Sequence, residues 1–372
     1  MKIRLFAFLF AFFCLIPTAH ALDLSLITYQ PDWQVGDKAT YVTDIESTLD
    51  APAHPFAPLF KNQPDRSQIT TTHTVIGKDD NSTEFQVRIQ HLYLPESLLS
   101  KLLPDWRQEF EKRMGYPFTK IEEFLYQNAI FSYRIDNTGK IIEITHLEDW
   151  IDFHNEATKL SNGKLQPIPP EKREEKLQEL QKYANEDLLP HLVQQIDIFP
   201  HRSDFLGKNF AIGQNQPSTV TITYPTLPNF TTKPLDFAFD SAENVIIASD
   251  GTFQIAISYG FTEQDLHKFG DRALKNLDPF FYPKESQKEI RSFWKEWRKN
   301  QPLSITGKIE SGIQFRPGDK FAKEFTYLAS YSGELYPNRI PRRHTVADEP
   351  VPFSIRTAIV TRLISEEKGG QP

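Results

Sequence analysis

The nearest approach to a metal site in this sequence is a pair of histidines around an acidic run: His146 and His154, with Glu148, Asp149 and Asp152 between them. A zinc enzyme that holds its ion on one helix places two histidines four residues apart. At about 1.5 Å of rise per residue, His146 and His154 would lie roughly 12 Å apart along a helix, too far for one ion. We therefore predict no metal site here. Glu148 and Asp149 are better explained as favourable charges at the positive end of a helix.

No pattern selects nucleophilic or acid–base catalysis. No G-x-S-x-G elbow occurs, and the only cysteine, Cys14, lies in the N-terminal apolar segment. The 49 acidic residues supply many carboxylate pairs of the kind that a glycosidase needs, so no single pair stands out. His73 and His91 lie in or beside expected strands whose faces the sequence does not fix. We therefore nominate no catalytic, cofactor-binding or metal-ligating residue and no cofactor.

The first 21 residues are typical of a secretory signal peptide. Lys2 and Arg4 precede an apolar run over 5–16, and Ala19-His20-Ala21 forms a cleavage site. The apolar run is too short to cross a bilayer, so we expect cleavage after Ala21 and no stable transmembrane anchor afterwards; the alternative is an anchor that is retained. A mature chain without cysteine has no disulfide, which favours the bacterial periplasm, or secretion from a bacterium, over a eukaryotic secretory pathway.

The charge balance argues against a nucleic acid partner. The chain has 42 basic and 49 acidic residues, interleaved along its length, for a formal net charge of −7. A surface of this kind repels a polyphosphate backbone and keeps a protein in solution. With 39% hydrophobic and 24% charged residues, the chain is able to bury a sizeable core.

Alternation of apolar and polar residues predicts strands with one buried face over much of the chain. In 83–91, for example, Phe85, Val87 and Ile89 alternate with polar residues. The strands that we expect are 40–48, 69–76, 83–91, 131–135, 140–144, 219–224, 244–249, 252–259, 303–309, 321–331 and 353–364. Asn137-Thr138-Gly139 and Asp250-Gly251 predict hairpin turns, the second of type I′ because Asp-Gly suits that turn.

Helical periodicity lies between these groups of strands. We expect helices at 98–110, after Pro169-Pro170 and over 290–297, where Ile290, Phe293, Trp294 and Trp297 form one stripe. We interpret that stripe as core. Strands and helices in separate groups, without regular βαβ alternation, predict an α+β fold in which helices pack across antiparallel sheets built from hairpins. The domains that we expect are a signal peptide at 1–21, an N-terminal α+β unit at 22–160, a helical connection at 161–200 and a C-terminal α+β unit at 201–372.

Three loops share a glycine followed by a polar pair: Gly36-Asp37-Lys38, Gly207-Lys208-Asn209 and Gly318-Asp319-Lys320. Two of them also have an aromatic residue three positions earlier, Trp33 and Phe315. Two explanations stay open. The recurrence records a duplicated β unit, or it marks a turn that several strands need at their start.

Two classes of function remain. The 29 Phe and 13 Tyr give an aromatic share of 13%, which fits a noncatalytic envelope protein that binds a hydrophobic ligand such as a lipid, a peptide or a neighbouring envelope protein. Packing of the core is the simpler explanation of the same aromatics. The alternative is a periplasmic hydrolase acting on cell-wall or sugar polymers, which the compartment and the five Trp allow but do not select.

Overall fold

The computed structural model describes most of the chain after the N-terminal segment. The described residues are 26–50, 65–93, 128–160, 166–185, 204–224, 235–275, 287–292, 305–335 and 351–369, with the single residues 112, 124, 189, 284 and 295. Of the helices that we expected, 98–110 lies outside these residues, and so do Phe293, Trp294 and Trp297 of the aromatic stripe.

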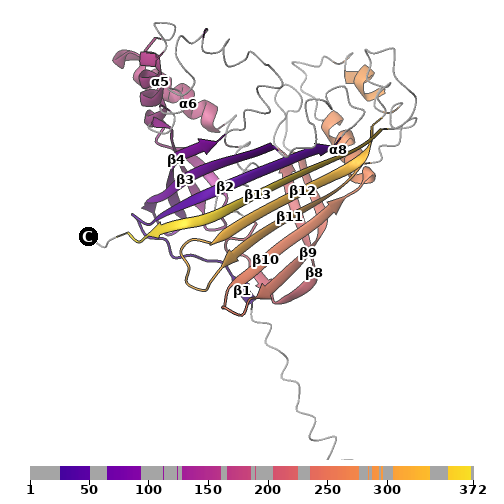
Figure 1. The fold of residues 1–372 in the computed structure, drawn as a ribbon. Coiled ribbons are helices and arrows are strands. Elements are labelled where there is room, and N and C mark those ends of the chain that lie inside the picture. Colours follow the sequence, from indigo (N-terminus) through magenta and orange to yellow (C-terminus); the bar gives the residue numbers. More distant parts are fainter. Residues whose placement is uncertain are drawn as a thin grey trace, which may run out of the picture.

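Eleven of the described strands form one antiparallel sheet in the order β6-β5-β4-β3-β2-β13-β12-β11-β10-β9-β8 (Figure 1). Their bounds are β2 (Lys38–Asp50), β3 (Asp65–Lys78), β4 (Ser82–Tyr93), β5 (Ile130–Asp136), β6 (Ile141–Thr145), β8 (Gly213–Tyr224), β9 (Leu235–Ile247), β10 (Phe253–Phe261), β11 (Ile305–Phe315), β12 (Glu324–Leu335) and β13 (Val351–Glu367). Because β13 pairs with β2, strands from both halves of the chain share the sheet. The domain boundaries stay a prediction.

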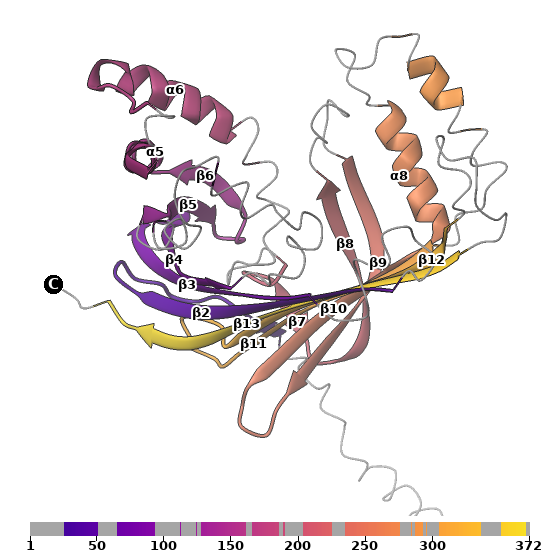
Figure 2. The ribbon, with the colours of Figure 1, turned by 45° about the horizontal axis from the view of Figure 1, so that its top comes forward.

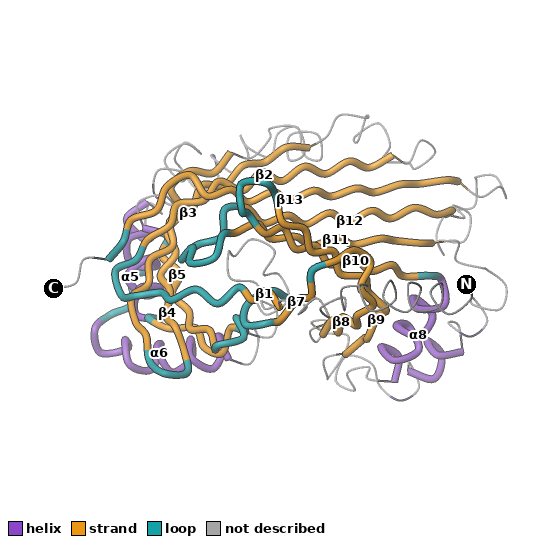
Figure 3. The backbone as a smooth tube through the Cα atoms, turned by 90° about the horizontal axis from the view of Figure 1, so that it is seen from below, coloured by secondary structure: helices purple, strands orange, loops and turns teal. Residues whose placement is uncertain are grey.

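Two short strands and a few helices complete the described fold. β1 (Leu26–Thr28) pairs with β7 (Asn209–Ala211) and lies inside the curve of the large sheet (Figure 3). The helices are α5 (Glu148–Leu160), α6 (Arg173–Tyr183), α8 (Glu263–Lys275) and the 3₁₀ turn η2 (Pro170–Lys172). Helices α5 and α6 lie beside the β5–β6 edge, and α8 lies beside β9 and β10 (Figure 2). The expected α+β class with antiparallel hairpins is confirmed.

The two ends of the large sheet differ in the length of their connections. At one end, here called the hairpin end, short turns join β3 to β4, β5 to β6, β9 to β10 and β11 to β12. At the other, the connection end, the chain leaves and re-enters the sheet through 51–64, 94–129, 225–234, 262–304 and 336–350. Binding sites often lie where long connections gather on a rigid scaffold.

The hairpin at Asp250-Gly251 is confirmed, but the expected turn type is wrong. Gly251 has a φ of 78°, whereas Asp250 is not among the described residues with positive φ, and a type I′ turn needs both. The Asp250 carboxylate instead accepts hydrogen bonds from the backbone N–H (3.0 Å) and hydroxyl (2.9 Å) of Thr252. An aspartate that bonds the backbone two residues on favours a longer loop with a single left-handed glycine. Gly139, with a φ of 79°, fills the left-handed position expected in the β5–β6 hairpin.

Two of the three recurring glycine loops share one turn geometry. Gly36 and Gly318 have φ values of 90° and 84°, and the aspartate after each accepts a hydrogen bond from the backbone N–H three residues before it, Gln34 N–H at 2.7 Å and Arg316 N–H at 2.7 Å. Only glycine adopts such a φ without strain. A shared turn is thus enough to explain the repeated residues of these two loops, while the duplicated β unit stays a prediction.

Candidate functional site

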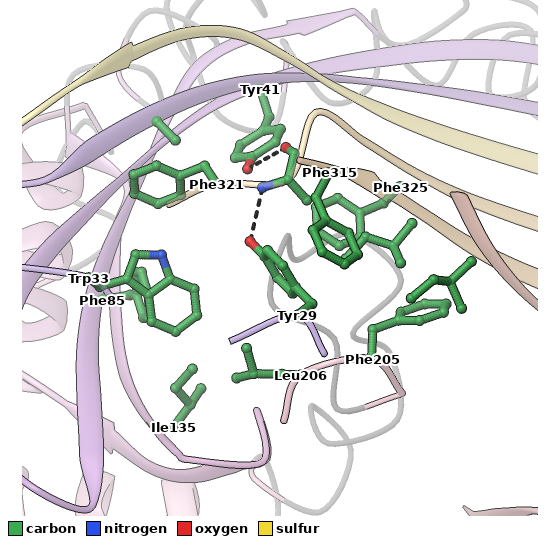
Figure 4. Close-up of a cluster of buried hydrophobic side chains, with 14 of the residues drawn as sticks. Tyr29, Trp33, Tyr41, Phe85, Ile135, Phe205, Leu206, Phe315, Phe321 and Phe325 are labelled. Carbon is green, nitrogen blue, oxygen red and sulfur yellow. Dashed lines mark hydrogen bonds between the residues drawn. The ribbon is translucent and has the colours of Figure 1, made fainter. Parts of the chain in front are cut away.

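The concave face of the large sheet carries the hydrophobic core, and the core is concentrated at the hairpin end. Here the β1–β7 layer packs onto the sheet, so that Tyr29, Trp33 and Phe205 meet Tyr41 and Phe325 (Figure 4). Tyr41, Phe205 and Phe325 are no more than 2% exposed. Aromatic rings contact one another throughout this layer; the Trp33 and Phe85 rings, for example, stand perpendicular with their centroids 5.0 Å apart.

Two buried tyrosines, Tyr29 after β1 and Tyr41 in β2, form hydrogen bonds with the backbone of the β11–β12 turn. The N–H of Ala322 donates to the Tyr29 hydroxyl oxygen (2.9 Å), and the Tyr41 hydroxyl donates to the Ala322 carbonyl (3.1 Å), as the dashed lines in Figure 4 show. Burial raises the pKa of both tyrosines, so both hydroxyls stay protonated. These bonds satisfy the polar atoms of a turn that crosses an aromatic core.

Toward the connection end the same face carries apolar side chains that alternate with hydroxyl-bearing ones, and its side chains are less buried. Strand residues two apart share a face, so the side chains that continue the row of Tyr41 along β2 are Thr43, Ile45 and Ser47. Thr43 is buried, whereas Ile45 and Ser47 are half-buried. The half-buried apolar side chains on this part of β2, β3, β12 and β13 are Ile45, Ile69, Tyr327, Tyr331, Phe353 and Ile359. We call these six residues the upper concave patch.

The upper concave patch extends sideways over β10 and β11. The Phe261 ring lies directly over Gly307, because a Cβ added there would fall 2.0 Å from its ring carbon. The Phe261 ring also contacts Tyr331, with centroids 5.3 Å apart. Glycine at this point lets an aromatic side chain lie flat against the sheet, which widens the apolar surface without a protruding side chain.

Pairs of hydroxyl groups lie on the concave face on both sides of the Ile45–Ile359 pair. The hydroxyls of Thr43 and Thr361 lie 2.9 Å apart, and those of Ser47 and Thr357 lie 3.3 Å apart. In each pair one hydroxyl donates to the other, so part of the hydrogen-bonding capacity of these residues is used within the sheet. The concave face therefore carries hydroxyl groups beside its apolar side chains.

The opposite, convex face is polar. An open depression of about 430 Å³ lies there between β2, β3 and β13, on the side of Asp44 and Arg362. Its charges are paired: Arg362 contacts Asp44 (3.1 Å) and Glu324 (3.0 Å), and Arg66 contacts Glu46 (3.1 Å). Neutralised pairs on a wet surface leave no excess charge for an ionic ligand.

The two histidines of the acidic run contact different groups. His146 lies before α5 with a φ of 53°, and its ring nitrogens face Glu84 (3.3 Å) and Glu148 (3.4 Å). His154 contacts the carbonyl of Gln166 (3.1 Å) instead. No cluster of three metal-ligating side chains occurs among the described residues. As expected, Glu148 and Asp149 occupy the first turn of a helix.

Two further groups with a shifted pKa are His73 in the core and Asp250 at a turn. His73, which the sequence left without a face, is 1% exposed beside Tyr41, and burial lowers its pKa to about 3. The exposed Arg316 guanidinium and the Thr252 hydroxyl and N–H lower the pKa of Asp250 at its turn. Neither group lies on the upper concave patch, so what that patch offers a ligand is apolar contact.

Comparison with known proteins gives only loose likenesses. No protein-family model matches the chain, and no curated protein matches its sequence. Among solved structures, lipovitellin, in a structure describing its lipid–protein interactions, is similar with a TM-score of 0.35 and 10% identity, over 92% of this chain and 26% of that one. An outer membrane channel from Pseudomonas putida F1 is similar with a TM-score of 0.15 and 8% identity, over 90% of this chain and 98% of that one. Scores this low say nothing of what this chain binds.

Proposed function

We propose that this chain is an exported, noncatalytic envelope protein that binds a hydrophobic ligand, such as the acyl chain of a lipid, on its upper concave patch. One observation carries the proposal: the apolar face continues beyond the core layer, where Ile45, Ile69 and Ile359 remain only half-buried. A contiguous apolar patch that folding leaves partly open marks a binding surface in many proteins.

The chemistry of the patch suits an acyl chain. Burying the remaining surface of a half-buried isoleucine or tyrosine contributes about 0.5 kcal/mol, well under half of what a full side chain gives, and each buried methylene of the ligand adds about 0.8 kcal/mol. The three isoleucines of the patch lie on three neighbouring strands, β2, β3 and β13, and offer a surface across which an extended chain is able to lie. Export to the periplasm, which rests on the signal peptide, would bring the patch to lipids and lipidated proteins.

None of the helices in the described part of the chain has the length and hydrophobicity that crossing a bilayer requires.

A matched pair of substitutions on β13 tests the proposal. Ile359 lies on the concave face and Val360, its neighbour, on the convex face, and both are half-buried. We expect Ile359→Asn to weaken binding of a fluorescent fatty acid about tenfold, since roughly 1.4 kcal/mol corresponds to a factor of ten. Val360→Asn should leave it unchanged.

Native mass spectrometry of protein purified from the envelope supplies the complementary measurement. We expect an apolar molecule to copurify with the wild-type protein and to be depleted in Ile359→Asn. Melting temperatures of both variants show whether they remain folded. Equal loss of binding in the two variants, or no copurifying molecule and no fatty acid binding by the wild type, would refute a ligand on this face.

A further inference from the structure

The two edges of the large sheet are protected to different degrees. The β6 edge is five residues long, carries Glu143 and leads directly toward α5. The β8 edge is 12 residues long and pairs with β9 alone among the described strands. Its sequence, GQNQPSTVTITY, contains no charged residue. Long uncharged edges are ready templates for another strand, and proteins usually protect them.

Among the described residues, the features that block a further strand lie in the half of β8 at the hairpin end. There the pairing with β9 is irregular between Gly213 and Gln216, Asn215 has a φ of 54°, and Pro217 lacks a backbone donor. Bulges and prolines of this kind block the addition of a further strand. From Ser218 to Tyr224 the pairing with β9 is regular, and that segment contains no proline, glycine or charge.

This unprotected segment is complementary to itself. Around Thr221 the sequence reads Thr219-Val220-Thr221-Ile222-Thr223, the same in both directions by residue class. If two copies paired antiparallel about a two-fold axis at Thr221, threonine would meet threonine and each β-branched aliphatic residue would meet another. Such an arrangement needs no shift in register to match both faces.

The protein already uses the same type of pairing inside its own sheet. The hydroxyls of Thr40 and Thr72 lie 3.1 Å apart across β2 and β3, and Thr43 pairs in the same way with Thr361 across β2 and β13. Thr219 and Thr221 are exposed on the convex side of β8, while Val220 packs against the core cluster. Cross-strand threonine pairs stabilise neighbouring strands.

We propose that 218–224 of β8 is a dimerisation edge, at which a second copy of this chain adds its own β8 antiparallel about Thr221. The two large sheets become one continuous sheet, and the apolar faces at Val220 of each copy adjoin. The inference does not depend on the ligand proposed above.

Cysteine cross-linking tests both the dimer and its register. The only native cysteine is Cys14, so the full chain carrying Cys14→Ser has no other thiol. On that background, Thr221→Cys places the two thiols of a dimer opposite one another. The Cα atoms of paired strands lie roughly 4.5 to 5.5 Å apart, a distance that a disulfide spans. Thr219→Cys, equally exposed, would face its own copy about 13 Å away along the strand, at roughly 3.3 Å per residue. We expect a disulfide-linked dimer for Thr221→Cys and not for Thr219→Cys.

Sedimentation equilibrium provides a readout that needs no oxidation. We expect the wild-type chain to sediment at twice the monomer mass and Thr221→Lys, which opposes two like charges across the axis, to sediment as a monomer. Thr306→Lys, at an exposed threonine of the interior strand β11, should remain dimeric. A wild-type monomer, equal cross-linking at both cysteine positions, or a dimer that Thr221→Lys leaves intact would overturn the proposal.

Discussion

Removing the carboxylate of Asp37 should be among the most damaging single changes at the hairpin end. Asp37 is fully buried and accepts two hydrogen bonds from Lys320 Nζ (2.8 and 2.6 Å), one from the Gln34 N–H (2.7 Å) and one from the Gly369 N–H (2.9 Å). It therefore joins the turn before β2, the β11–β12 turn and the segment after β13.

The size of the effect follows from what each partner loses. Breaking a buried ion pair from one side costs about 3 to 5 kcal/mol, but the Lys320 side chain is 24% exposed and is able to turn toward water. Two backbone N–H groups also lose their acceptor, at about 1 kcal/mol or more each where water does not reach them. We expect Asp37→Ala to lower the free energy of unfolding by about 3 to 4 kcal/mol.

Denaturant unfolding of Asp37→Ala beside Asp319→Ala isolates the buried pair. Asp319 occupies the same position in the matching turn, but its carboxylate accepts only the Arg316 N–H in the described contacts, so its loss should cost about 1 kcal/mol. Burial alone would raise the pKa of Asp37, yet Lys320 and the two N–H groups lower it below the ordinary value of 3.8. The contribution of Asp37 should thus be full above that value and fade as the pH falls through the lower folded pKa. Equal losses for the two alanine variants would refute the reasoning.

Three further predictions concern single residues. His73 stays neutral in the folded protein because its pKa is about 3, whereas in the unfolded chain it takes up a proton near pH 6.5. The free energy of unfolding of the wild type, measured with urea, should therefore fall by about 2 kcal/mol between pH 6.5 and 5, and that of His73→Gln should not. Gly369→Ala places a Cβ 2.5 Å from the Val35 carbonyl oxygen and should lower the free energy of unfolding by about 1 to 3 kcal/mol. Gly318→Ala should cost less, because its Cβ meets no atom within 4 Å, although Gly318 has a φ of 84°. Thermal melts that rank the two variants the other way would contradict this. If the aromatic stripe is core, Trp294→Ala should cost about 3 to 5 kcal/mol, and a variant as heat-stable as wild type would show that it is not.

Strands were the most predictable part of the fold because their signal is local. Alternation in 83–91 and the Asp250-Gly251 turn each depend on a few neighbouring residues, and both lie where the sequence places them. β1 and β7 escaped prediction because three residues carry no period. Helix α8 was missed, although Thr262 and Asp265 have the spacing of a capping box. The Asp265 carboxylate accepts hydrogen bonds from the backbone N–H (3.0 Å) and the hydroxyl (2.8 Å) of Thr262 at the start of the helix.

The turn residues show where local reasoning fails. Asp-Gly predicted a type I′ turn, but the side chain of Asp250 has a better option in the N–H and hydroxyl of Thr252 and in Arg316, whose guanidinium lies 2.5 Å from it. Arg316 comes from a turn 66 residues away in sequence. A partner so distant in the chain selects among turn types that the dipeptide alone leaves nearly equal.

The upper concave patch depends on relations that no local pattern contains. Ile45 and Tyr41 have the same alternation and the same kind of neighbours in the sequence, yet Tyr41 is fully buried and Ile45 is not. The difference arises because the β1–β7 layer, from two remote segments, packs at the hairpin end and not over Ile45. The abundance of aromatic residues was therefore explained in part by the core, as the simpler interpretation held. In this sheet the position of the covering layer distinguishes the buried core from the half-buried patch. If the patch binds the proposed ligand, substitutions at opposite ends of one strand should separate stability from binding.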